Sequence, residues 1–239
     1  PDDLKTQAER QGFKLIGGKV PTTQVFVAYY CCHQKDVKDP SAGWAVPNPK
    51  LGDVRVRRAL SKGINRDELN KTFFRGKGVP TYLTSFDPTR YGWNSEWERR
   101  FAVDYGYDPE GAKRLLAEAG YGPSNPLEQN IVLIELAQFP GTMDVQEAVA
   151  NYWRNVGIKV NLVNMDNAQR TASTRGLRFE NHWTIDGTSS DVHIYLQTRW
   201  GPSFSAGGSV GHGGRDAEVT RQFLALRSEL DEKKQEAAY

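Results

Sequence analysis

The sequence has few of the residues that define disulfide-rich or metal-binding proteins. Among 239 residues there are two cysteines, two methionines and four histidines. Cys31 and Cys32 are adjacent, and neighbouring cysteines rarely satisfy disulfide geometry, so no disulfide framework is predicted. Two thiols with His33 beside them are also too few for a thiolate zinc site. A pair of buried thiols is the simplest interpretation.

The sequence also lacks an excess of charge of one sign, and it lacks long apolar runs. Lys and Arg total 31 against 29 for Asp and Glu, and runs such as Arg55, Arg57 and Arg58 have acids nearby. A nucleic-acid-binding domain would gather its cations into one dominant patch, so no nucleic-acid partner is expected. No apolar run reaches the length of about eighteen residues that indicates a transmembrane helix. The composition is typical of a globular domain.

What the sequence does contain is an alternation of strand and helix patterns. IVLIEL (131–136) and IKVNLV (158–163) predict strands, and DVQEAVANYWRNVG (144–157) between them predicts a helix. Strand, crossover helix and strand make a βαβ unit with parallel strands, so the predicted fold class is α/β. The other expected elements are helices over 3–11, around 167–175 and over 216–230, and strands over 22–32 and 179–185.

Residues 55–69, RVRRALSKGINRDEL, predict two helices that meet at Asn65. The cations Arg55, Arg58 and Lys62 are expected on a mostly solvated face. Asn65 is predicted to cap the second helix, with Glu68 three residues later completing a capping box. The apolar residues at helical spacing, which predict the buried face, are Val56, Ala59, Leu60, Gly63 and Ile64.

A further helix has both ends specified by its sequence, YDPEGAKRLLAEAGY (107–121). Asp108 is the expected N-cap, Pro109 stands at the first helical position and Gly120 supplies the left-handed stop. Residues 75–106, by contrast, hold many turn formers and aromatics and are predicted to be a long ordered loop. A second loop, rich in Gly and Ser, is expected over 187–214.

Few motifs indicate catalysis. GGSVG (207–211) matches the G-x-S-x-G pattern of α/β serine hydrolases with Ser209 as nucleophile, but the strand and helix that should flank it are missing and no histidine follows Asp216. Asp186 and Asp191 have a loop spacing that acid–base carboxylates could share. The histidines form no metal-ligand spacing. We therefore predict no enzyme, no metal and no cofactor, with the serine hydrolase kept as the alternative.

The order of the elements resembles a known family. DVRVRRALSKGINRDEL, then an aromatic loop, then YDPEGAKRLLAEAGY, then a strand, a helix and NVGIKVNLV is similar to the family 5 extracellular solute-binding proteins, the peptide, opine and nickel receptors of ABC importers. The resemblance runs from about Thr22 to the end. It implies that 55–69 is a structural helical segment, not a catalytic basic site.

The resemblance also implies an architecture and a role. It suggests a periplasmic-binding-protein-like lobe with βαβ units and long ordered loops: residues 1–21 would end a first lobe and 22–239 would form the second, truncated at both ends. A monomeric receptor would capture a short peptide or similar polar solute between two lobes and deliver it to an ABC permease in the membrane. Its expected location is the periplasm, or the cell surface as a lipoprotein. An isolated lobe acting as a protein-interaction module is a further interpretation.

The ligand-binding residues that the resemblance implies lie in HWTIDG (182–187). Trp183 is similar to an aromatic that lines the pocket, and Asp186 to the acid that receives a peptide's ammonium group. The family's usual Asp-Pro continuation is absent here, which makes Asp191 a competing candidate. Alternatively, Trp183 is a core aromatic and Asp186 caps a turn.

Overall fold

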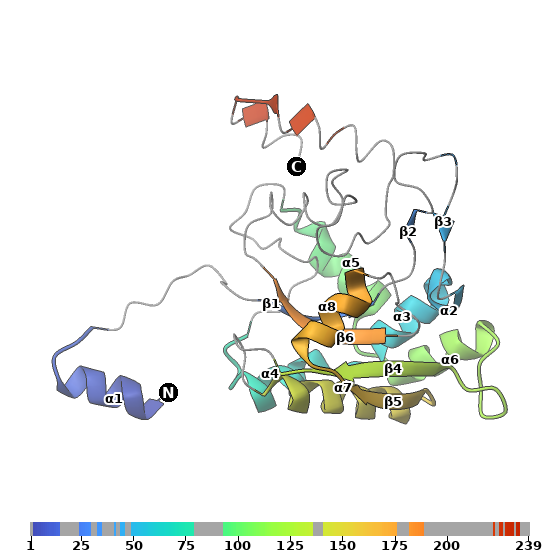
Figure 1. Ribbon diagram of the computed structural model, residues 1–239, viewed down its shortest axis with the longest axis horizontal. Helices are drawn as coiled ribbons and strands as arrows, with labels where there is room; N and C mark the ends of the chain where they lie inside the picture. Colours follow the sequence, from blue (N-terminus) through green and yellow to red (C-terminus); the bar gives the residue numbers. More distant parts are fainter. Residues whose placement is uncertain are drawn as a thin grey trace.

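A mixed α/β architecture is present in the computed structural model (Figure 1). The first element, α1 (Asp2–Arg10), matches the predicted N-terminal helix and lies apart from the rest of the ribbon. The structure describes residues 2–14, 24–29, 33–34, 41, 44–45, 49–78, 93–135, 141–175, 182–188, 222, 225–226, 228–231 and 233–234.

A four-stranded sheet in the order β1-β6-β4-β5 organises the fold. β4 pairs in parallel with both β5 and β6, whereas β1 runs antiparallel to β6. The strand β4, the helix α7 and the strand β5 thus form the predicted βαβ unit. The strands are β1 (Gln24–Tyr29), β4 (Glu128–Leu133), β5 (Lys159–Asn164) and β6 (His182–Thr188), and a separate ribbon joins β2 (His33–Gln34) to β3 (Trp44–Ala45).

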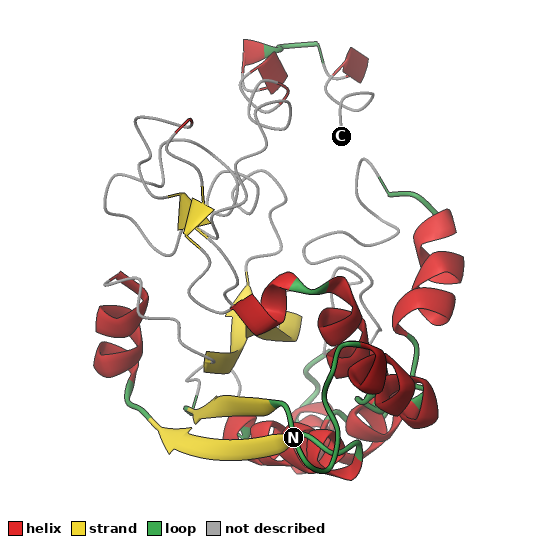
Figure 2. Cartoon of the chain, turned by 90° about the vertical axis from the view of Figure 1, so that its right-hand side faces the viewer, coloured by secondary structure: helices red, strands yellow, loops and turns green. Residues whose placement is uncertain are grey.

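The hydrophobic core lies between β4 and β5 and the helices gathered beside the sheet, which Figure 2 shows in red. α3 (Val54–Lys62) and α7 (Thr142–Asn155) supply much of it. Trp153 of α7 is the largest fully buried side chain, and its indole Nε1 donates a 2.9 Å hydrogen bond to the carbonyl of Leu60. A buried indole N–H needs such a partner, so this contact fixes α7 against α3.

The segment 55–69 forms two helices, as predicted. The whole predicted apolar face of α3 is buried, and α3 itself follows the short helix α2 (Pro49–Gly52). Asn65 caps α4 (Arg66–Phe73), its Oδ1 accepting a 3.1 Å hydrogen bond from the Glu68 amide. The Glu68 carboxylate returns a contact to the Asn65 side-chain amide, where a capping box would use the backbone N–H.

α6 (Pro109–Glu118) also has its predicted ends. The Asp108 carboxylate accepts a 2.8 Å hydrogen bond from the Gly111 amide, and Pro109 is the first helical residue. Gly120 has a φ of 89°, the left-handed conformation that glycine adopts without steric cost. Ala112 and Leu116 are buried, and Leu115 and Ala119 pack partly buried against the core.

The predicted loop over 75–106 is wrong at its C-terminal end, because residues Glu96–Tyr105 form the helix α5. Trp97, Phe101 and Tyr105 follow one another at intervals of four, which places them along one side of a helix. Glu96 adds an i,i+3 contact, accepting a 2.9 Å hydrogen bond from Arg99 Nε. The aromatics were interpreted as the packing of a loop, and their helical period was overlooked.

The bounds of two strands, β4 and β6, differ from the predicted ones. β4 starts at Glu128, three residues before the predicted strand, because Glu128, Gln129 and Asn130 pair with β5 although they are polar. β6 continues to Thr188, so the first residues of the predicted loop over 187–214 belong to the sheet. The helix α8 (Asn167–Arg175) is present as predicted. Most of the predicted helix over 216–230 lies outside the described residues, although 222, 225–226 and 228 are helical.

The helices that the structure describes include none that is both long enough and apolar enough to cross a lipid bilayer. The longest of them, α7, has 14 residues.

Candidate functional site

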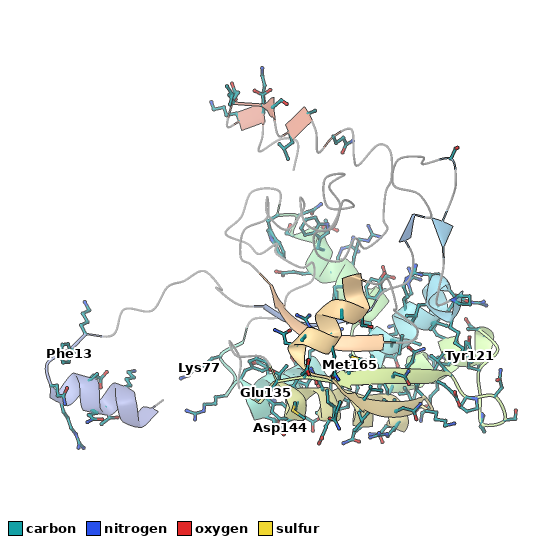
Figure 3. All side chains as sticks on the ribbon, viewed as in Figure 1. Phe13, Lys77, Tyr121, Glu135, Asp144 and Met165 are labelled. Atoms are coloured by element: carbon teal, nitrogen blue, oxygen red, sulfur yellow. The ribbon has the colours of Figure 1, made fainter. Side chains whose placement is uncertain are left out.

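Three parallel strands end at the same edge of the sheet, and this carboxyl edge is where open α/β sheets usually bind ligands. β4 ends at Leu133, β5 at Asn164 and β6 at Thr188. The antiparallel β1 begins at this edge, since Gln24 pairs with Thr188. In Figure 3, Tyr121, which precedes β4, and Glu135, which follows β4, are labelled at opposite ends of the sheet region. The carboxyl edge is the end near Glu135.

The end of β4 is fixed to α7 by a buried amide. Gln146 is fully buried, and its Oε1 accepts a 2.9 Å hydrogen bond from the Ile134 amide while its Nε2 donates to the Ile134 carbonyl at 3.3 Å. Two bonds to one residue leave the chain little freedom as it emerges from the sheet. Sequence reasoning did not identify Gln146, whose partner lies twelve positions away.

Glu135, the next residue, caps the start of α7. Its carboxylate accepts hydrogen bonds from the amides of Gly141 at 2.6 Å and Met143 at 3.4 Å. Gly141 has a φ of 90° and lacks a capping side chain of its own, so Glu135 supplies the acceptor that an N-cap residue normally provides. The carboxylate also faces the positive end of the helix dipole.

A second acid caps the helix that follows β5. Asp166 Oδ1 accepts a 2.7 Å hydrogen bond from the Gln169 amide, and Gln169 Oε1 accepts one of 3.0 Å from the Asp166 amide. This reciprocal pair is a capping box for α8. One residue earlier, the Met165 amide donates to the Leu133 carbonyl at 3.1 Å, which extends the parallel pairing of β4 and β5 beyond the strands.

The predicted ligand residues Trp183 and Asp186 both lie in β6. Position 183 is opposite Ile131 of β4, a core residue on the face of the sheet that α7 covers. Position 186 is opposite Phe26 of β1 and lies three residues nearer the carboxyl edge. Because strand residues alternate between faces, positions 183 and 186 belong to opposite faces of the sheet. Asp191 lies outside the described residues.

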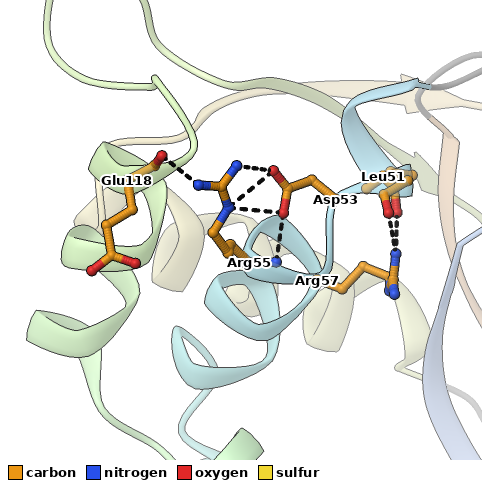
Figure 4. A network of polar contacts seen from close by, with 6 residues as sticks. Leu51, Asp53, Arg55, Arg57 and Glu118 are labelled. Atoms are coloured by element: carbon orange, nitrogen blue, oxygen red, sulfur yellow. Dashed lines mark hydrogen bonds and ion pairs between the residues drawn. The ribbon is translucent and has the colours of Figure 1, made fainter.

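The basic segment 55–69 is tied into the fold by hydrogen bonds. Arg55 bonds the Asp53 carboxylate and donates from Nη1 to the Glu118 carbonyl at 2.7 Å, and Arg57 donates to the Leu51 carbonyl at 2.8 Å (Figure 4). The side-chain hydrogen bond from Arg55 is the main cause that lowers the pKa of Asp53, and the same bond raises the pKa of Arg55. These contacts are structural, as the sequence resemblance implied.

The prediction of a mostly solvated cationic face is wrong for part of this segment. The side chain of Lys62 is only 13% exposed. Burial lowers the pKa of Arg66 to about 10, so its guanidinium still carries its charge near neutral pH. Lys62 donates to the Val103 carbonyl, whereas Arg66 donates to the Ser61 carbonyl and lies over the Phe101 ring. The alkyl stems of both side chains can pack while the charged groups stay hydrogen-bonded.

Other candidate chemistry has little support. Among the described residues, no group of three or more His, Cys, Asp or Glu is placed to hold a metal ion. Cys31, Cys32 and the G-x-S-x-G motif with Ser209 lie outside the described residues.

The sequence and the fold were compared with known proteins. Residues 1–208 match the family described as bacterial extracellular solute-binding proteins, family 5 Middle. The match begins before Thr22, where the resemblance in the sequence starts, and it ends before the end of the chain. No curated protein matches.

Solved structures with the same fold include HbpA2, DppA and AgaA. HbpA2 from Haemophilus parasuis is 18% identical with a TM-score of 0.69, and the alignment covers 100% of this chain and 46% of HbpA2. DppA from Helicobacter pylori, in complex with the peptide STSA, is 20% identical with a TM-score of 0.63 over 99% of this chain and 46% of DppA. AgaA from A. tumefaciens R10, in complex with agropinic acid, is 21% identical with a TM-score of 0.63 over 92% of this chain and 42% of AgaA.

The chain thus spans less than half the length of these solved proteins, while nearly all of it takes part in the match. The shared fold and the family match over residues 1–208 agree with the order of elements and with the parallel βαβ unit. The serine hydrolase alternative gains no support from either comparison. The chain belongs to the family 5 bacterial extracellular solute-binding proteins.

Proposed function

We propose that this chain is the substrate-binding component of an ABC importer and captures a short peptide or similar polar solute. The observation that carries the proposal is the family match over residues 1–208. It is supported by a sheet whose parallel strands end at one edge. The protein acts by reversible capture without catalysis and hands its solute to a membrane permease. It works as a monomer in the periplasm, or at the cell surface as a lipoprotein.

In this proposal residues 1–21 end a first lobe, and residues 22–239 form the second lobe of a longer two-lobed receptor. The length of the solved proteins supports this division, since each of those compared is more than twice as long as the part that matches. Closure of two lobes over a solute would supply most of its burial. A single lobe alone would then bind much more weakly than the whole receptor.

The solute's charged end is assigned to the carboxyl edge of the sheet, with Asp186 as the acid that receives an ammonium group. A carboxylate in a partly desolvated cleft forms a strong charge-assisted bond with such a group. Glu135 and Asp166 at the same edge are held by backbone amides, so they serve chiefly as helix caps. Trp183, at a position on the face that α7 covers, fits the core-aromatic alternative better than a pocket wall.

The test is a calorimetric titration of the full-length receptor with short peptides, comparing Asp186→Asn with Asp191→Asn. Loss of a charge-assisted contact costs about 2 kcal/mol, so Asp186→Asn should weaken binding about thirtyfold. Glu118→Gln, which changes an exposed acid at the end of α6 and far from the carboxyl edge, is the matched control and should leave affinity unchanged. If only Asp191→Asn weakens binding, the assignment moves to Asp191.

The serine hydrolase alternative is tested separately with an ester reporter. We expect the wild type and Ser209→Ala to show the same background hydrolysis, because the sequence around G-x-S-x-G predicts neither the strand nor the helix that activates such a serine. A rate that depends on Ser209 would instead show that the protein is an enzyme.

A further inference from the structure

The helix α5 is attached to the lobe in an unusual way. None of its ten residues is buried, yet it packs beside α3. A helix of this length in a domain normally contributes an apolar stripe to the core. The described contacts that join α5 to its neighbours are instead made by the cations of α3 and α4.

Three cations contact α5 in succession. Arg58 Nη2 lies 3.5 Å from the Asp104 carboxylate, and Lys62 Nζ donates a 2.9 Å hydrogen bond to the Val103 carbonyl. The guanidinium of Arg58 also lies 5.9 Å from the centre of the Tyr105 ring. The guanidinium of Arg66 lies 5.0 Å from the centre of the Phe101 ring, within the range of a cation–π contact.

A serine completes the set. Ser61 Oγ donates a 3.1 Å hydrogen bond to the Tyr105 carbonyl and accepts one of 2.9 Å from Arg66 Nη2. Arg58, Ser61, Lys62 and Arg66 will be called the polar clamp. Arg58 and Lys62 are four residues apart and lie on one side of α3, and Arg66 is the first residue of α4.

The polar clamp acts on the C-terminal end of α5. Both carbonyls that it binds, those of Val103 and Tyr105, belong to the last turn, where a helix carries its partial negative charge. Cations are favourable at this end. They add to the partial burial of the aromatic side chains Trp97, Phe101 and Tyr105, none of which is fully buried. Contacts of this kind weaken with ionic strength, whereas burial of apolar surface does not.

We propose that α5 is a releasable element, held on α3 by the polar clamp, that can detach while α3, α6 and the sheet stay folded. The device is independent of the proposed function, and its test needs no ligand.

Hydrogen–deuterium exchange of the full-length protein tests the proposal directly. Exchange is measured in residues 96–105 and in 109–118 at about 0.01 M and about 1 M NaCl, where the Debye length falls from about 30 to about 3 Å. We expect exchange in α5 to rise about tenfold at high salt, with α6 changing less than twofold. Equal changes in the two helices, or no change in α5, would overturn the proposal.

A pair of variants checks the assignment to the polar clamp. Arg58→Gln removes a clamp contact, whereas Arg55→Gln, on the same helix, removes a bond to the Glu118 carbonyl of α6. Arg58→Gln should raise exchange in α5 about fivefold, and Arg55→Gln should leave α5 unchanged. Circular dichroism must show that both variants keep the wild-type fold. If both variants loosen α5 equally, the contacts of Arg58 are not what holds it.

Discussion

The helices α5 and α6 have the same length and both pack on α3, but they are held there by different forces. α6 buries Gly111, Ala112 and Leu116, whereas α5 buries no residue. α6 starts with a capping hydrogen bond to the Asp108 side chain, while Ser95 at the start of α5 makes no such bond. One helix belongs to the hydrophobic core, and the other is attached by cations and aromatic rings.

The difference shows that proximity to the same helix does not imply the same stability. Apolar burial is insensitive to salt and supports cooperative unfolding with the core, whereas partly exposed ion pairs contribute little each. α6 should therefore unfold with the core, and α5 should open at lower free energy. The predictions below test this contrast in order of expected effect.

The largest effect is expected from truncation inside α6. Leu116 is 4% exposed, and Leu116→Ala should lower the free energy of unfolding by about 3 kcal/mol through lost burial and a residual cavity. Val103 of α5 is 70% exposed, so Val103→Ala should change stability by less than about 0.5 kcal/mol. Urea denaturation followed by circular dichroism measures both. Similar losses in the two variants would contradict the contrast.

A smaller effect is expected at the two helix starts. Asp108→Ala removes the cap acceptor of α6 and should cost about 1 kcal/mol, while Ser95→Ala should be close to neutral because no side-chain cap bond is lost. Asp108 also lies 3.7 Å from Lys62, a contact that adds little at a partly exposed site. Denaturation midpoints of the two alanine variants make the comparison, and a larger loss for Ser95→Ala would refute it.

The smallest effect concerns the start of α3, on which both helices pack. Hydrogen bonds from Arg55 lower the pKa of Asp53 below its ordinary value of 3.8. A folded-state pKa below the unfolded one stabilises the protein above pH 3.8, and this contribution is lost as the pH falls through the folded value. Asp53→Asn should therefore lose less thermal stability than the wild type between about pH 5 and about pH 2. Identical acid sensitivity would show that this cap does not matter.

The parts of the fold that the sequence predicts best are those specified by neighbouring residues. Asp108, Pro109 and Gly120 define α6 within fourteen positions, and the βαβ unit follows from three adjacent patterns. α5 was not predicted because its aromatics at four-residue intervals stand among many turn formers, and its hydrogen-bond partners Ser61 and Lys62 lie about forty residues earlier.

The candidate site was less predictable, because its contacts form only after the strands align. Gln146 bonds Ile134, twelve residues earlier, and Glu135 bonds the amide of Gly141, six residues later. The residues in between carry no local motif. An acid just after a strand, followed by a glycine before a helix, was an available signal. Trp183 and Asp186 are three residues apart, and only the strand assignment shows that they belong to opposite faces.

The central claim, that the protein is a solute receptor, is tested most directly by native mass spectrometry of the full-length protein purified gently without added ligand. The account predicts additional bound mass that disappears on denaturation, with a series spaced by amino-acid residue masses if the solute is a peptide. A single non-peptide mass would keep the receptor function and change the solute. Bare protein mass, together with no thermal stabilisation by a panel of peptides and small polar solutes, would contradict the claim.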